Sequence, residues 1–119
     1  MRYVSTRGRA EVLDFAQAMM TGLARDGGLY LPETIPTLSA EQIAALEGLP
    51  YEEAALRVIA PFVGDSFSQD ELSGAIARAY AGFDHVARAP LVQLAPGHHL
   101  LELFHGPTLA FKDFAMQLI

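Results

Sequence analysis

The chain contains one lysine, Lys112, which lies in the most apolar stretch near the C-terminal end, Leu109-Ala110-Phe111-Lys112-Asp113-Phe114-Ala115. Every other basic residue is an arginine. Arginine stays protonated in any protein environment, whereas a buried lysine amine can lose its proton and become a nucleophile. The use of lysine at this one position therefore indicates a candidate Schiff-base residue. The alternative interpretation is a surface lysine whose stem lies along apolar neighbours and whose ammonium reaches water.

The residues before Lys112 predict how it is positioned. We expect a strand between His99 and His105, a turn at Gly106-Pro107-Thr108, and then a helix that carries Lys112 in its first turn or just after. The apolar side chains of Phe111 and Phe114 are expected to desolvate the amine and so disfavour its ammonium form. The positive end of the helix dipole acts in the same direction.

Up to about residue 90 the sequence pattern is mostly helical. Apolar residues recur at intervals of three and four from Glu11 to Leu23 and again from Ser68 to Gly82, which predicts two amphipathic helices. Two short strands, Arg2–Thr6 and Leu29–Leu31, are expected to pair, with a turn at Asp26-Gly27-Gly28 before the second strand. The first predicted helix has an apolar face of Val12, Phe15, Ala16, Met19, Met20 and Leu23.

Several helix boundaries can be predicted from capping and proline signals. The pairs Ser39/Gln42 and Ser68/Glu71 have the spacing of capping boxes, in which each side chain satisfies a backbone amide at the helix start. Pro50 suits the first turn of a helix between these two, and Pro61 is expected to kink or end that helix.

The character of the sequence changes after Pro90. Leu91–Leu94 and the segment from His99 predict two strands around a turn at Ala95-Pro96-Gly97. The expected fold class is therefore α/β. A mostly helical unit with a small strand pair occupies residues 1–90, and the first strand–turn–helix elements of a second, truncated domain occupy residues 91–119.

Composition excludes several classes of function. The chain has 119 residues, 51% of them hydrophobic, and a net charge of −6, which argues against nucleic acid as a partner. There are no cysteines, so disulfides, thiol catalysis and cysteine-based metal sites are excluded. No apolar run has the roughly 20 residues of a membrane span, so we expect a cytoplasmic protein. The apolar helical pattern continues to Ile119, which indicates the front of a longer polypeptide.

The histidines do not predict a metal site. His99 and His105 share a face of an extended strand but lie roughly 20 Å apart along it, because each residue adds about 3.3 Å. We expect them, with His98, to be turn and strand-end residues. His105 adjoins the turn before Lys112 and is a weaker candidate for lining an active site. Arg7 is a weaker candidate anion ligand, with a surface salt bridge as the alternative.

The segment Leu101-Glu102-Leu103-Phe104-His105-Gly106-Pro107-Thr108-Leu109-Ala110-Phe111-Lys112-Asp113-Phe114 resembles the signature of the threonine synthase family around its pyridoxal-phosphate lysine. Tyr3-Val4-Ser5-Thr6-Arg7-Gly8 and Gly22 to Pro32 resemble the opening segment of that family. Related fold-type II pyridoxal enzymes carry Pro-Thr-Gly-Ser-Phe-Lys. Leu109-Ala110 replaces Gly-Ser here, which favours threonine synthase over the dehydratases.

The resemblance implies a lyase that converts O-phospho-L-homoserine and water to L-threonine and phosphate, with pyridoxal 5′-phosphate as cofactor. By this analogy Lys112 carries the cofactor and moves protons at Cα and Cβ of the substrate. Phosphate leaves from Cγ, and water adds at Cβ. Phe111 packs near the cofactor, and Thr108 and Asp113 serve local capping and helix support.

The resemblance also implies that this chain lacks part of the site. The glycine-rich loop for the cofactor phosphate and the contact to the pyridine nitrogen lie further along in such enzymes, and no such loop occurs in these 119 residues. We therefore expect the fragment alone to be inactive. Two alternatives stay open: another fold-type II pyridoxal enzyme such as a dehydratase, or a non-catalytic helical interaction domain.

Overall fold

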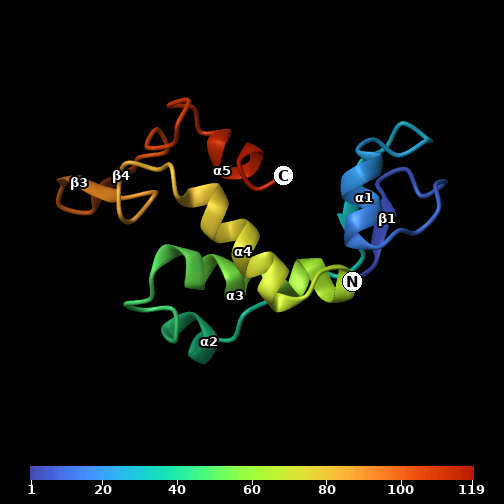
Figure 1. The fold of residues 1–119 in the computed structure, drawn as a ribbon, viewed down its shortest axis with the longest axis horizontal. Coiled ribbons are helices and arrows are strands. Elements are labelled where there is room, and N and C mark those ends of the chain that lie inside the picture. Colours follow the sequence, from blue (N-terminus) through green and yellow to red (C-terminus); the bar gives the residue numbers. More distant parts are fainter. The chain divides into compact units, whose positions relative to one another are not determined.

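The computed structural model describes all 119 residues and confirms the α/β composition. Its strands form two separate two-stranded antiparallel sheets, β1–β2 and β3–β4. None of its helices combines the length and the apolar character needed to cross a membrane. In chain order the elements are β1 (Tyr3–Ser5), α1 (Phe15–Thr21), β2 (Tyr30–Pro32), α2 (Ala40–Ala44), α3 (Tyr51–Val63), the 3-10 turn η1 (Gly64–Ser66), α4 (Gln69–Tyr80), β3 (Leu91–Ala95), β4 (His98–Leu101) and α5 (Asp113–Met116) (Figure 1).

The chain divides into two compact units. The first contains Met1–Glu47 and Arg57–Leu72, and the second contains Gly48–Leu56 and Ser73–Ile119. Helices α3 and α4 each contribute residues to both units. The domain layout expected from the sequence, with a boundary near residue 90, stays a prediction.

In the first unit the predicted strand pair is confirmed. Strand β1 pairs antiparallel with β2, with Tyr3 opposite Pro32 and Ser5 opposite Tyr30. The buried Tyr3 hydroxyl donates a hydrogen bond to the backbone oxygen of Phe62, 3.0 Å away, and its ring meets Phe15 edge-on. This small sheet therefore packs on residues of α1 and α3.

Helix α1 is shorter than the periodicity predicted. It begins after Asp14, whose carboxylate accepts from the Gln17 amide, because Leu13 is held in extended conformation by a bridge to Tyr3. It ends at Gly22 with φ +68°, a conformation that glycine adopts without strain. The predicted apolar face was wrong in part, since Met20 and Leu23 are 82% and 67% exposed.

The predicted helix starts are confirmed for α2 and α4. Ser39 and Gln42 form a capping box at α2, and Ser68 and Glu71 exchange the corresponding hydrogen bonds before α4. Helix α3 runs through Pro61 and ends two residues later at Val63, so the proline lies in its last turn.

In the second unit an aromatic cluster forms the centre of the core. The Tyr80 ring lies 4.9 Å from that of Tyr51 and 5.3 Å from that of Phe83, and the Phe114 ring lies 5.0 Å from Phe83. Ile76 of α4 is fully buried. The cluster therefore joins α4 to the short C-terminal helix α5 that follows Lys112.

The predicted strands after Pro90 form a hairpin, β3–β4, with its turn at Pro96-Gly97. The second strand ends at Leu101 rather than near His105. Every residue of both strands is exposed, including apolar residues on each face.

Candidate functional site

Lys112 lies at the end of an irregular segment that follows the hairpin. We expected a helix directly after Thr108, but the chain turns from Gly106 to Lys112 and α5 begins only at Asp113. The cause is visible at Leu109, whose φ of +61° places it in the left-handed region that interrupts a right-handed helix. Lys112 itself has helical angles, φ −63° and ψ −20°, and occupies the cap position of α5.

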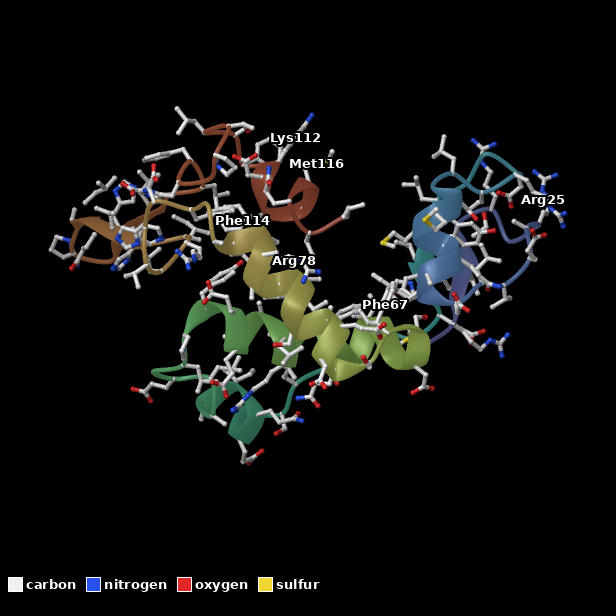
Figure 2. All side chains as sticks on the ribbon, viewed as in Figure 1. Arg25, Phe67, Arg78, Lys112, Phe114 and Met116 are labelled. Atoms are coloured by element: carbon white, nitrogen blue, oxygen red, sulfur yellow. The ribbon has the colours of Figure 1, made fainter.

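The expected desolvation of Lys112 by its apolar neighbours was wrong for these 119 residues. The Lys112 side chain is exposed and forms no hydrogen bond or ion pair. Phe111 is 66% exposed, and Phe114 packs into the aromatic core instead of over the amine. Figure 2 shows Lys112 pointing outward from the start of α5. The chain therefore presents the amine freely but does not bury it.

A buried carboxylate holds the segment that carries Lys112. Asp113 is 2% exposed, and its Oδ2 accepts a hydrogen bond from the Thr108 backbone amide at 2.9 Å. Its Oδ1 accepts from the Thr108 hydroxyl at 2.7 Å, with Gln117 Nε2 at 3.5 Å. These bonds, the Thr108 hydroxyl first, lower the pKa of the Asp113 carboxyl below its ordinary value. The local support expected from Thr108 and Asp113 is thus present, but the expected capping was wrong, since α5 begins after Lys112 without a side-chain cap hydrogen bond.

Gly106 closes this loop from the other side. It is buried, and a Cβ placed on it would lie 2.5 Å from both Cβ and Oδ2 of Asp113. Real side chains do not approach so closely, so glycine is required by space here rather than by its φ angle. The Gly106 backbone therefore packs directly against the carboxylate that binds Thr108.

Helix α5 is anchored to α4 by a buried tyrosine. The Tyr80 hydroxyl donates to the backbone oxygen of Phe114 at 2.9 Å, and Tyr80 is 3% exposed. Burial raises the pKa of the Tyr80 phenol. Lys112 is thus followed within two residues by a fixed point of the core.

Sequence reasoning missed Tyr80 and Gly106 as supporting residues. Tyr80 lies four residues after Ile76, on the buried face of α4, so the helical period alone could have identified it as a core position. The contact between Gly106 and Asp113 had no such signal, because it depends on how the irregular segment folds back.

The histidines near this segment form a small cluster of their own. His105 Nε2 lies 2.6 Å from Glu102 Oε2, and the rings of His105 and His85 are 5.1 Å apart. No group of three or more His, Asp or Glu side chains is arranged to hold a metal ion.

Arg7 lies in the first unit, at the Asp26-Gly27-Gly28 turn. Its Nη1 donates to the backbone oxygen of Asp26 at 3.1 Å, not to a carboxylate as a salt bridge requires. The Asp26 carboxylate accepts from the Ser5 hydroxyl at 2.7 Å and from the amides of Arg9 and Gly28, which lowers its pKa to about 2. The segment is a turn closed by its own hydrogen bonds, and the predicted turn is confirmed.

Comparisons with known proteins agree on one family. Residues 2–80 match the model of the threonine synthase N terminus. The threonine synthase of Pseudomonas aeruginosa is 52% identical over all 119 residues, which cover 25% of that protein, and that of Schizosaccharomyces pombe is 42% identical over 98% of the chain and 23% of the relative. A crystal structure of PLP-bound threonine synthase from Brucella melitensis matches with a TM-score of 0.96 and 55% identity, over 99% of this chain and 25% of that one.

These matches cover the whole chain but only part of each relative. The chain spans about a quarter of the length of the relatives it matches. The family model covers β1 to α4, and the P. aeruginosa and B. melitensis matches also cover the Lys112 segment. The chain belongs to the threonine synthase N-terminus family.

Proposed function

We propose that this chain is the N-terminal part of a pyridoxal-phosphate-dependent threonine synthase, which converts O-phospho-L-homoserine and water to L-threonine and phosphate in the cytoplasm. The observation that carries the proposal is the likeness of the whole chain to a PLP-bound threonine synthase at 55% identity, with an unpaired lysine in the segment that resembles the family signature. Residues 1–90 are proposed as its N-terminal helical domain. Residues 91–119 are proposed as the first elements of the fold-type II catalytic domain.

The residues around Lys112 suit the covalent attachment that pyridoxal phosphate requires. Lys112 offers an exposed, unpaired amine on a segment held by Asp113, and the exposed ring of Phe111 precedes it. When bound, pyridoxal phosphate stabilises negative charge that develops on the substrate carbon atoms. Lys112 is proposed to hold the cofactor through Nζ and to move protons at Cα and Cβ. Phe111 is proposed to pack against the cofactor.

The one glycine pair in a turn, at Asp26-Gly27-Gly28, does not suit the cofactor phosphate. The turn at Asp26-Gly27-Gly28 is closed by its own hydrogen bonds, and the Asp26 carboxylate would repel a phosphate. A side chain on Gly28 would collide with the Ser5 hydroxyl, so this glycine serves close packing within the unit. The phosphate and pyridine-nitrogen ligands are therefore proposed to come from sequence beyond these 119 residues.

The test uses the full-length protein that contains this chain. Borohydride reduction in the presence of pyridoxal phosphate should fix the cofactor on one peptide, and mass spectrometry should place it on Lys112. Lys112→Ala and Lys112→Arg should both lose nearly all threonine formation from O-phospho-L-homoserine, because arginine fills similar space but stays protonated. A structural or salt-bridging lysine would tolerate arginine.

The outcomes separate the alternatives. Label on another lysine, or an active Lys112→Arg enzyme, would contradict the role of Lys112. Labelled Lys112 with formation of a 2-oxo acid from threonine, and no turnover of O-phospho-L-homoserine, would favour a dehydratase. Absence of any bound cofactor would favour the non-catalytic interaction domain.

A further inference from the structure

The backbone between Thr108 and Asp113 forms a closed loop, and Lys112 is its penultimate residue. The loop is closed by two hydrogen bonds from Thr108, one from its amide and one from its hydroxyl, to the two different carboxylate oxygens of Asp113. The two ends of a six-residue segment are thus joined. These hydrogen bonds add to the backbone hydrogen bond from the Asp113 amide to the Ala110 oxygen, which lies within the same loop.

The Asp113 carboxylate forms no hydrogen bond or ion pair with the lysine amine. Its oxygens accept hydrogen bonds from Thr108 and Gln117, the Ala110 backbone amide also contributes, and Lys112 forms no ion pair. Asp113 is 2% exposed, while Lys112 is exposed. An aspartate next to a lysine would ordinarily suggest charge pairing. Here the carboxylate accepts hydrogen bonds from the backbone amide and the hydroxyl of Thr108, five positions earlier.

The loop holds an unfavourable backbone conformation. Leu109, inside it, has φ +61°, which costs a non-glycine residue free energy and persists only where surrounding contacts enforce it. The close packing of Gly106 on the Asp113 carboxylate leaves no space for the loop to relax on that side. The Thr108–Asp113 hydrogen bonds therefore hold the loop in a conformation that is strained at Leu109.

We infer that Asp113 is a positioning residue for Lys112: it fixes the direction of the lysine amine through the Thr108 loop, by geometry and not by charge. This inference rests on the proposed function, because it concerns the residue proposed to hold the cofactor. A reactive amine must be held close to its productive geometry, and a misplacement of about 1 Å can cost on the order of 100-fold in rate. Asp113 touches neither the amine nor, by this assignment, the substrate.

The geometry predicts different effects for three substitutions. Asp113→Ala removes every closing bond and should lower kcat on the order of 100-fold, with little change in KM. Asp113→Asn can keep both bonds, since its Oδ1 accepts from the Thr108 amide and its Nδ2 donates to Thr108 Oγ1, so kcat should stay within about tenfold. Thr108→Val loses only the hydroxyl hydrogen bond, so its kcat should lie between those of the two Asp113 variants. Thr108→Ser keeps the hydroxyl and should keep kcat.

The measurement is kcat and KM per cofactor-loaded subunit of the full-length protein, with loading counted from the absorbance of bound cofactor. This normalisation removes losses that come only from misfolding or poor yield. Asp84→Ala is the matched control, because Asp84 is an exposed carboxylate of the same unit whose side chain has no partner. It should match the unsubstituted protein.

Three results would overturn the inference. One is Asp113→Ala with full kcat per loaded subunit. Another is Asp113→Asn as impaired as Asp113→Ala, which would assign the effect to charge. The third, which decides the matter if Asp113→Ala does not fold, is Thr108→Val with the same kcat as Thr108→Ser. Failure of the proposed function looks different, since the unsubstituted protein would then carry no label on Lys112.

Discussion

The backbone around Lys112 is held in place, but the amine of Lys112 has no apolar environment. The amine is exposed, and the residues after it are fixed by Asp113 and by the aromatic core around Phe114. Position and desolvation are separable requirements for a reactive lysine, because the first fixes where the amine points and the second changes its protonation. These residues hold the segment around Lys112 and leave its amine exposed.

A methyl group at Gly106 should disrupt the same loop from outside it. Gly106→Ala places a Cβ against the Asp113 carboxylate, and overpacking of this kind costs about 1–3 kcal/mol of folding free energy. We expect a lower thermal midpoint and less cofactor bound per subunit of the full-length protein.

Gly82→Ala is the control for this prediction. A Cβ at Gly82 meets no atom within 4 Å, so this variant should behave like the unsubstituted protein. Equal midpoints for the two alanine variants would show that the backbone shifts freely at Gly106, contrary to the packing described.

The residue-scale features differ in how far the sequence predicted them. The single lysine in an arginine-using chain, with a neighbourhood that resembles a known signature, led to the proposal of Lys112 as the cofactor residue, and this role stays a prediction. The hydrogen bonds between Thr108 and Asp113 span five residues, a separation that neither a helix nor a strand produces. They form because Leu109 adopts a left-handed conformation, which no local sequence signal demands of a leucine.

Among the elements, α4 and α5 are linked by aromatic packing and by one hydrogen bond from the Tyr80 hydroxyl. Tyr80→Phe removes the hydrogen bond to the Phe114 oxygen and leaves that acceptor without its partner, which should cost about 1–3 kcal/mol. Thermal or urea unfolding of the full-length protein measures this loss.

Tyr30→Phe is the matched control for the tyrosine change. The Tyr30 hydroxyl also donates to a backbone oxygen, that of Glu11 at 3.2 Å, but this hydrogen bond is exposed, so water can replace it. The loss of folding free energy in Tyr30→Phe should therefore be small. If both phenylalanine variants unfold at the same point as the unsubstituted protein, the Tyr80 bond does not anchor α5.

The Asp26 turn predicts an acid-sensitive element in the first unit. The folded pKa of Asp26 is about 2, below its ordinary value of 3.8, so its charged form stabilises the folded turn. That contribution is present above about pH 4 and is lost as the pH falls from there toward 2. Asp26→Asn should reduce the difference in thermal midpoint between pH 5 and pH 3.

Asp65→Asn serves as the comparison for the acid series. Asp65 is an exposed carboxylate of the same unit. Its substitution should leave the pH dependence nearly unchanged. An Asp26→Asn protein with the full acid sensitivity of the original would contradict the assignment.

Elements were predicted best where the signal is local. The capping boxes at Ser39 and Ser68 fixed the starts of α2 and α4, because each involves atoms only three residues apart. Helix α1 was predicted too long, since the bridge between Leu13 and Tyr3 is a contact between distant segments that overrides helical periodicity. Helix α5 begins later than predicted, because Leu109 adopts a left-handed conformation that interrupts a helix.

For the whole molecule, the isolated 119 residues should bind pyridoxal phosphate weakly at best. Lys112 is the one proposed attachment, and the ligands of the cofactor phosphate are proposed to lie beyond these residues. Titration of the purified fragment, followed by the absorbance of bound cofactor, measures this. Tight, stoichiometric binding by the fragment alone would contradict the prediction.

The hairpin β3–β4 has a consequence for biosynthesis. Its strands expose apolar side chains on both faces, and two strands alone are marginally stable in water. In a polypeptide of the relatives' length, about three quarters of the chain leaves the ribosome after this hairpin, which takes on the order of tens of seconds. During that interval its open edges can pair with other nascent chains. Chaperone capture of ribosome-bound intermediates should therefore peak when the hairpin has emerged and the rest of the chain has not.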